Sequence, residues 1–144
     1  MLSVYPGIFI QDKQGRITVI FPDLNHLATF GDDMQEAMEM AVDCLAGYIH
    51  SEKRDGHELP PPSPVEAVTP QSEDIDENDP DIARLFVSLV SVDAEEYAKA
   101  HFNKAVKKTL SIPQWLNDAA MERKVNFSKV LQNALMQELN IAKA

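Results

Sequence analysis

Residues 106–113 read Val-Lys-Lys-Thr-Leu-Ser-Ile-Pro, and this stretch decides the interpretation of the C-terminal third of the chain. Side chains alternate between the two faces of a β-strand. The apolar face would carry Val106, Leu110 and Ile112, and the polar face would carry Lys107, Thr109 and Ser111. Pro113 suits the first turn of a helix, where its missing N–H is not needed. The stretch therefore predicts a strand over residues 106–112 that leads directly into a helix.

Two helices are predicted after this strand, one over residues 114–124 and one that begins at Phe127. Asn126 is a good N-cap for the second, because its side-chain oxygen can accept a hydrogen bond from the first helical turn. Apolar residues recur at helical spacing, so each helix would have one apolar side. They are Trp115, Leu116, Ala119 and Ala120 in the first helix, and Phe127, Val130, Leu131, Ala134, Leu135 and Leu139 in the second.

One strand and two short helices bury too little apolar surface to fold alone, because units of about 40 residues usually need oligomerisation or covalent staples. Antiparallel pairing of the strand with that of a second copy would complete a two-stranded sheet and bury both helix pairs. The product is a ribbon-helix-helix homodimer, and a two-stranded ribbon of this kind fits the major groove of double-stranded DNA. We therefore expect residues 99–144 to form a DNA-binding and dimerisation domain.

The expected DNA contacts follow from this geometry. Lysine can donate to guanine, and threonine or serine can donate or accept, while free N–H groups at a helix start suit a phosphate. The predicted DNA-binding residues are Lys107, Lys108, Thr109, Ser111, Asn126, Phe127, Ser128 and Lys129. The alternative is a helical hairpin with a solvated polar edge, which composition alone does not distinguish from a ribbon.

The charge of the chain is unevenly distributed along the sequence. Residues 1–98 hold 5 Lys/Arg and 20 Asp/Glu, a balance of −15, whereas residues 99–144 hold 8 Lys/Arg and 3 Asp/Glu, a balance of +5. The sum is the net charge of −10. The basic part could meet a polyanion, and the acidic part either meets a basic protein or serves only solubility.

The first 58 residues predict a hairpin, a strand and a helix. Strands are expected over residues 5–11 and 16–21, joined by the loop 12–15, and a short third strand over residues 27–30. A helix with one apolar stripe would follow, with Asp32 as its N-cap and Gln35 in the capping-box position. The helix should fade over residues 50–54 and end at Gly56.

The remainder of the first domain is a long connection followed by a strand and a short helix. Residues 59–64 are rich in proline and should be extended, and the acidic residues 69–80 should form a loop. Residues 85–92 are apolar on both faces, which suits a strand inside a sheet, and Asp93 can cap a helix over residues 94–102. The fold class is therefore α+β, with a β-β-β-α-β domain over residues 1–98 and its helix packed on one sheet face.

No apolar run is long enough for a transmembrane helix, and residues 1–10 do not resemble a signal peptide. The single cysteine, Cys44, lies in the predicted helix, where a buried small hydrophobe is a better interpretation than a nucleophile. Together these features indicate a cytoplasmic protein that does not engage a membrane.

Several motifs in this order resemble the HicB-type antitoxins. The motifs are Tyr5-Pro6-Gly7-Ile8-Phe9, Ile17-Thr18-Val19-Ile20-Phe21-Pro22-Asp23-Leu24, Thr29-Phe30-Gly31-Asp32, Glu36-Ala37 with Ala41, and Leu59-Pro60-Pro61-Pro62-Ser63. A further similarity is to the ribbon-helix-helix tail of one branch of that family, and it covers residues 107–116 and 126–132. Two positions depart from its pattern: Asn25-His26 replace a usual Pro-Gly, and Val125 replaces a frequent glycine before the last helix.

The resemblance implies a partial RNase H-like fold for the first domain. It also implies a partner, a small HicA-type ribonuclease toxin that cleaves mRNA with a catalytic histidine, and repression of the shared operon through operator DNA. The sequence leaves open whether the N-terminal domains also pair and so join two homodimers into a tetramer.

An RNase H-like fold invites a nuclease hypothesis, which needs several carboxylates that converge on divalent metals. The middle of the first strand is Ile8-Phe9-Ile10, Asp12 falls in the turn, Asp23 lies at a strand end and Asp32 is assigned to a cap. The four histidines show no metal-binding spacing. We therefore expect no catalytic residue, no metal site and no cofactor, and hence not an enzyme.

Two hypotheses then compete. The first is an antitoxin that inhibits a HicA-type ribonuclease and represses its operon. The alternative is a stand-alone ribbon-helix-helix repressor whose acidic domain senses a ligand or mediates oligomerisation. A small basic open reading frame beside this one would favour the first.

Overall fold

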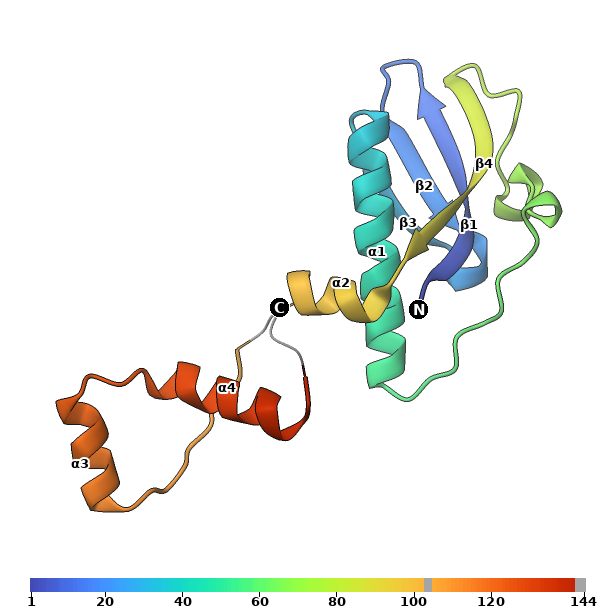
Figure 1. Ribbon diagram of the computed structural model, residues 1–144. Coiled ribbons are helices and arrows are strands. Elements are labelled where there is room, and N and C mark those ends of the chain that lie inside the picture. The colour runs from blue at the N-terminus through green and yellow to red at the C-terminus, as the bar shows by residue number, and fades with distance from the viewer. Residues whose placement is uncertain (103–104, 142–144) are drawn as a thin grey trace. The chain divides into compact units, whose positions relative to one another are not determined.

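The computed structural model describes residues 1–102 and 105–141. The chain divides into two compact units, Met1–Lys104 and Ala105–Ala144. The first unit contains a four-stranded antiparallel sheet with the strand order β3-β2-β1-β4 (Figure 1). Its strands are β1 (Ser3–Asp12), β2 (Ile17–Phe21), β3 (Leu27–Gly31) and β4 (Ile82–Val92), and its helices are α1 (Met34–Arg54) and α2 (Ala94–His101). The predicted α+β class and the β-β-β-α-β order are confirmed.

The turn of the hairpin between β1 and β2 is stabilised by the side chain of Asp12. Its Oδ1 accepts hydrogen bonds from the backbone N–H groups of Gln14, at 3.0 Å, and Arg16, at 2.9 Å. Gly15 has a φ of +95°, which a residue with a side chain rarely adopts. We had predicted that Asp12 lies in the turn, but it is the last residue of β1. Its local hydrogen bonds explain why the chain reverses here.

The core lies between one face of the sheet and α1, which runs across that face (Figure 1). The sheet contributes Tyr5, Phe9, Ile17, Val19, Phe21 and Val90, and α1 contributes Ala37, Ala41, Leu45, Ala46 and Ile49, all buried. The small alanines let the helix approach the sheet closely. The start of α1 also lies close to Gly31, where an added Cβ would be 2.3 Å from the backbone nitrogen of Ala37, so only glycine fits.

The last strand is not inside the sheet, and this sequence prediction is wrong. β4 lies at the sheet edge and pairs only with β1. Its two faces are apolar because each is covered, and not because the strand is central. One face joins the core, where Phe86 stacks on Phe9 with ring centroids 5.0 Å apart. The other side of the sheet is partly covered by the long connection, whose 3₁₀ turn Val65–Ala67 contacts β4.

The N-cap of α1 is Asp33 and not Asp32, which corrects the prediction by one residue. The Asp33 side chain accepts a hydrogen bond from the N–H of Glu36 at 2.8 Å. Glu36, not Gln35, completes the capping arrangement, because its carboxylate accepts from the N–H of Asp32 at 2.6 Å. The Asp32 side chain is exposed and lies 3.8 Å from Arg16. Sequence reasoning could not choose between two adjacent aspartates, since either can cap a helix.

We expect Asp33→Ala to lower the free energy of unfolding of the first unit by about 1 kcal/mol, the usual effect of losing an N-cap. The matched control is Asp32→Ala, which removes the same charge from the adjacent residue and should change stability by less than about 0.5 kcal/mol. Urea unfolding followed by circular dichroism measures both. If Asp32→Ala lowered the free energy of unfolding more than Asp33→Ala, Asp32 would be the N-cap, as predicted from sequence.

The proline-rich segment is fixed to the first unit by two side chains. The Tyr5 hydroxyl donates to the carbonyl of Pro60 at 2.6 Å. Asp23 accepts from the N–H of Ser63 at 2.7 Å and from its hydroxyl at 2.6 Å. Burial, and secondarily the charge of Asp23, raises the pKa of Tyr5, so the phenol remains a donor. Residues 57–64 form no helix or strand, as predicted.

The turn between the 3₁₀ helix Pro22–Leu24 and β3 is built from two left-handed residues. Asn25 has a φ of 56° and His26 a φ of 60°. His26 replaces the glycine of the HicB-type pattern, although glycine is the residue that most easily adopts this conformation. Its Nδ1 lies 2.7 Å from the carboxylate of Glu73, in the 3₁₀ turn Pro70–Glu73. The turn is thereby joined to the acidic connection.

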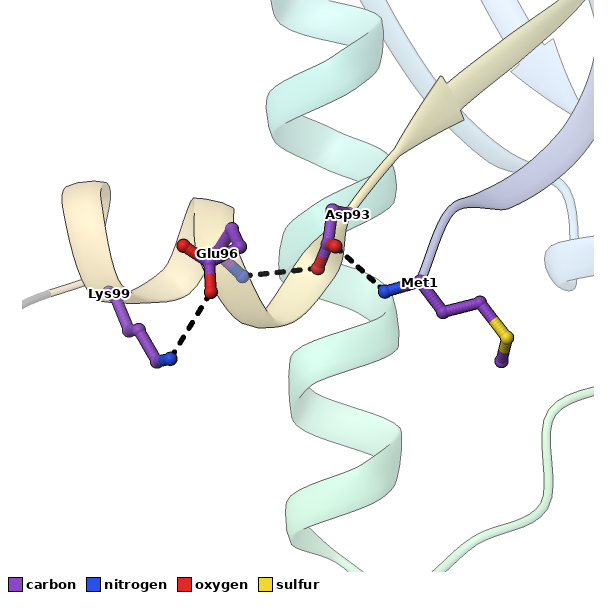
Figure 2. Close-up of polar contacts among 4 residues, drawn as sticks. All are labelled: Met1, Asp93, Glu96 and Lys99. Atoms are coloured by element: carbon purple, nitrogen blue, oxygen red, sulfur yellow. Dashed lines mark hydrogen bonds and ion pairs between the residues drawn. The ribbon is translucent and has the colours of Figure 1, made fainter. Parts of the chain in front are cut away.

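Asp93 is the N-cap of α2, as predicted (Figure 2). Its carboxylate accepts from the N–H of Glu96 at 3.2 Å and from the Met1 ammonium at 2.7 Å. The hydrogen bond from the ammonium, followed by that from Glu96, lowers the pKa of Asp93. One turn later, Lys99 pairs with Glu96 at 3.2 Å. The start of α2 thus lies beside the start of β1.

The second unit contains α3 (Gln114–Glu122) and α4 (Phe127–Glu138). Pro113 is the N-cap of α3 and not its first residue. The left-handed residue between the helices is Lys124, with a φ of 54°, so Val125 avoids a conformation that a β-branched side chain resists. Among the helices in residues 1–102 and 105–141, none combines the length and apolar character needed to cross a membrane.

Candidate functional site

The eight residues predicted to bind DNA all lie on the surface of the second unit. Lys107, Lys108, Thr109, Ser111, Asn126, Phe127, Ser128 and Lys129 are each exposed. Within the described residues, no hydrogen bond joins the stretch 107–111 to residues 126–129. The single chain therefore presents these residues but does not join them by hydrogen bonds into one site.

The strand predicted over residues 106–112 does not form in the single chain, where residues 105–113 have no regular secondary structure. The physical reason is that a strand is defined by hydrogen bonds to a neighbour. The described residues of the second unit include no other strand that could pair with this stretch. The ribbon predicted from sequence is thus not formed by the described residues of the second unit and stays a prediction.

The second unit has no buried residue within positions 105–141. Trp115 is 71% exposed and Val106 is 80% exposed, although both were predicted to lie on apolar faces. Further large hydrophobic residues are exposed in the same unit: Leu110, Ile112, Leu116, Met121, Phe127, Val130, Leu135, Leu139 and Ile141. Apolar surface of this extent is typical of an interface that a partner covers.

The start of α4 matches the prediction in detail. The Asn126 side chain accepts a hydrogen bond from the N–H of Lys129 at 3.1 Å. Among the described residues, the N–H groups of Phe127 and Ser128 donate to no protein acceptor. Two backbone donors at the positive end of a helix dipole, beside the Lys129 ammonium, are suited to an anion such as a phosphate.

The basic side chains of the second unit carry no recorded ion pair. In positions 105–141 of the structure, Lys107, Lys108, Arg123, Lys124 and Lys129 form no salt bridge with a carboxylate. Their charge is therefore directed to solvent or to a partner. The first unit has the opposite character, since residues 73–81 alone contain six carboxylates.

Of the three carboxylates considered for a nuclease, two have structural roles and the third is exposed. Asp12 holds the hairpin, Asp23 holds Ser63, and Asp32 is exposed beside Arg16. Across the described ranges, no group of three or more His, Cys, Asp or Glu side chains is placed to hold a metal ion. These positions give no support to the nuclease hypothesis.

Cys44 is half-buried on α1, less buried than we had predicted. Burial, and then the nearby charge of Asp43, raises the pKa of its thiol. A raised pKa keeps the sulfur protonated and disfavours nucleophilic chemistry, in agreement with the sequence interpretation.

The structure shows one groove that sequence reasoning missed, between α1 and α2. It is lined by Met38, Glu39, Val42, Tyr97 and His101 and has a volume of about 390 Å³. Met38 and Val42 lie at the margin of the apolar stripe of α1, where they are half-buried. The spacing of the stripe gave no signal of the groove, because α2 forms its other wall.

Comparisons with known proteins agree with the resemblance seen in the sequence. A family model described as HicB-like antitoxin of bacterial toxin–antitoxin system matches residues 5–135. The protein Antitoxin HicB 1 of Photorhabdus laumondii is 36% identical over 61 residues, which are 42% of this chain and 39% of that protein. The chain thus spans about two fifths of the length of this relative.

A solved structure with a similar fold covers nearly the whole chain. A chain of a toxin–antitoxin complex from Streptococcus pneumoniae is 31% identical with a TM-score of 0.60, over 96% of this chain and 99% of that one. The antitoxin HicB of Burkholderia pseudomallei is 20% identical with a TM-score of 0.45, over 97% and 98% of the two chains.

Proposed function

Because this chain belongs to the HicB-like antitoxins of bacterial toxin–antitoxin systems, we propose that it inhibits a HicA-type ribonuclease toxin and represses the operon that encodes both proteins. The DNA-binding part of the proposal rests on the second unit, whose positions 105–141 contain no buried residue and present exposed basic and polar side chains. A ribbon made of one strand from each of two copies forms only in the dimer. A single chain of such a protein would therefore leave these side chains exposed.

The homodimer forms when residues 106–112 of two copies pair as antiparallel strands and the apolar sides of α3 and α4 come together. Lys107, Thr109 and Ser111 of each copy then line one face of the ribbon and read base edges in the major groove. Lys108 and the start of α4, with its two free N–H groups and Lys129, bind backbone phosphates. In this proposal residues 99–144 form the ribbon-helix-helix domain.

Residues 1–98 form the toxin-binding domain, with a partial RNase H-like fold and a charge balance of −15. A ribonuclease that binds mRNA needs a basic surface, and an acidic partner suits such a surface electrostatically. A similar chain in a toxin–antitoxin complex from Streptococcus pneumoniae supports a toxin as the partner. The chain acts by binding and not by catalysis, in the cytoplasm, where the operator and mRNA are found.

Co-expression with the adjacent gene tests this function. Induction of the neighbouring toxin alone should stop growth, and co-expression of this chain should restore it. The chain should also lower expression of a reporter placed behind its own promoter. A chain that represses the reporter but neither rescues growth nor binds the neighbouring product would be a stand-alone repressor, which is the alternative function.

A further inference from the structure

The groove between α1 and α2 combines an apolar floor with a carboxylate at its rim. Met38 and Val42 supply aliphatic surface from α1, and the Tyr97 ring supplies aromatic surface from α2. Tyr97 is held in place because its hydroxyl donates to Asp43 at 2.9 Å and its ring stacks on His101 with centroids 3.9 Å apart. The aromatic wall is thus fixed before any partner arrives.

The carboxylates at this groove have no cationic partner within the described residues. Glu39 is exposed and accepts only from the Gln35 amide, at 3.2 Å. Asp43 accepts from the Tyr97 hydroxyl, which is neutral. The groove therefore has negative charge at its edge and apolar surface inside, a combination that matches a side chain with an aliphatic stem and a cationic head.

We propose that this groove receives an arginine or lysine side chain of the basic toxin. The stem lies on Met38 and Val42, and the cationic head lies near the Glu39 carboxylate and the Tyr97 ring. This inference rests on the proposed function and specifies the part of the acidic domain that the toxin contacts. The flexible Met38 side chain can adjust to the shape of the inserted stem.

A matched pair of charge reversals tests the location. Glu39→Arg reverses the charge at the groove, and Glu77→Arg does so in the acidic connection. Both glutamates are exposed and accept a hydrogen bond from a glutamine amide, at 3.2 Å and 3.0 Å, so the two variants differ mainly in place. The probe is the product of the adjacent toxin gene with its catalytic histidine replaced, and the measurement is isothermal titration calorimetry.

We expect Glu39→Arg to weaken toxin binding at least tenfold more than Glu77→Arg, while circular dichroism and operator binding stay unchanged. Equal losses for the two variants, or a greater loss for Glu77→Arg, would overturn the groove assignment and leave the antitoxin function standing. Failure of the unaltered chain to bind the toxin would instead contradict the proposed function itself.

A second measurement does not depend on substitution at the groove rim. The chain is labelled with ¹³C at its methionine methyl groups, and the Met38 signal is assigned from the spectrum of Met38→Leu. Toxin addition should shift or broaden the Met38 signal, while the signal of Met121, in the second unit, stays unchanged. An unchanged Met38 signal in the saturated complex would exclude the groove as the contact.

Discussion

Replacing both Lys107 and Thr109 by alanine is expected to weaken operator binding by roughly a thousandfold at constant salt. The homodimer loses four groove-facing side chains, and about 1 kcal/mol for each, the lower end of the range for a base contact, sums to about 4 kcal/mol. Gel-shift titration with the operator measures the affinity. Sedimentation should show an intact dimer, because neither side chain belongs to the apolar face of the ribbon.

The control for this variant removes the same residue types from the first unit. Lys13 and Thr69 are both exposed, and the Thr69 side chain makes no capping hydrogen bond. Lys13→Ala with Thr69→Ala changes the net charge equally and should leave operator affinity within about twofold, since the charge lies outside the DNA contact. If the Lys107 and Thr109 variant kept its affinity, the ribbon would not be the DNA-binding surface.

Phe9→Ala is expected to destabilise the first unit by about 3–5 kcal/mol, the typical effect of truncating a buried aromatic residue. Phe9 is 0% exposed, lies in β1 opposite Val19 and stacks on Phe86. Alanine would leave a cavity between the sheet and α1. Urea unfolding followed by near-ultraviolet circular dichroism in a Trp115→Phe background reports this unit, because all three tyrosines lie within it.

Phe30→Ala is the matched control for the core variant. Phe30 lies in β3, is 56% exposed, and its main neighbour is the Arg16 guanidinium, 5.2 Å from the ring centroid. Its removal should lower stability by no more than about 1 kcal/mol, the usual contribution of an exposed cation–π contact. Losses of similar size for Phe9 and Phe30 would mean that the core is not where the structure places it.

Local patterns predicted most of the first unit correctly. The hairpin followed from two alternating apolar runs around Gly15, and the long helix followed from an apolar stripe that ends near Gly56. The cap at Asp93 was also predicted, because a single aspartate precedes that helix. These features depend on residues close together in the sequence, so the sequence contains the information that they require.

The position of β4, the groove and residues 106–112 were mispredicted or missed for a shared reason, which is that each depends on long-range contacts. The edge position of β4 depends on which strand pairs with which, and an apolar strand covered by a connection from elsewhere looks the same in sequence as a central strand. The groove needs α2 beside α1, and no local pattern encodes that contact. The predicted strand over residues 106–112 needs a neighbouring strand to pair with, and the described residues of the second unit supply none.

The sequence by itself determined the strands and helices of the first unit, the division of charge along the chain and the membership of the HicB-like antitoxins. Each follows from spacing, composition or ordered motifs, which are properties of the linear chain. Tertiary structure alone decided that Asp23 accepts hydrogen bonds from Ser63 and that Glu39 borders an apolar groove. These relations depend on distances between side chains, and such distances exist only after the chain has folded.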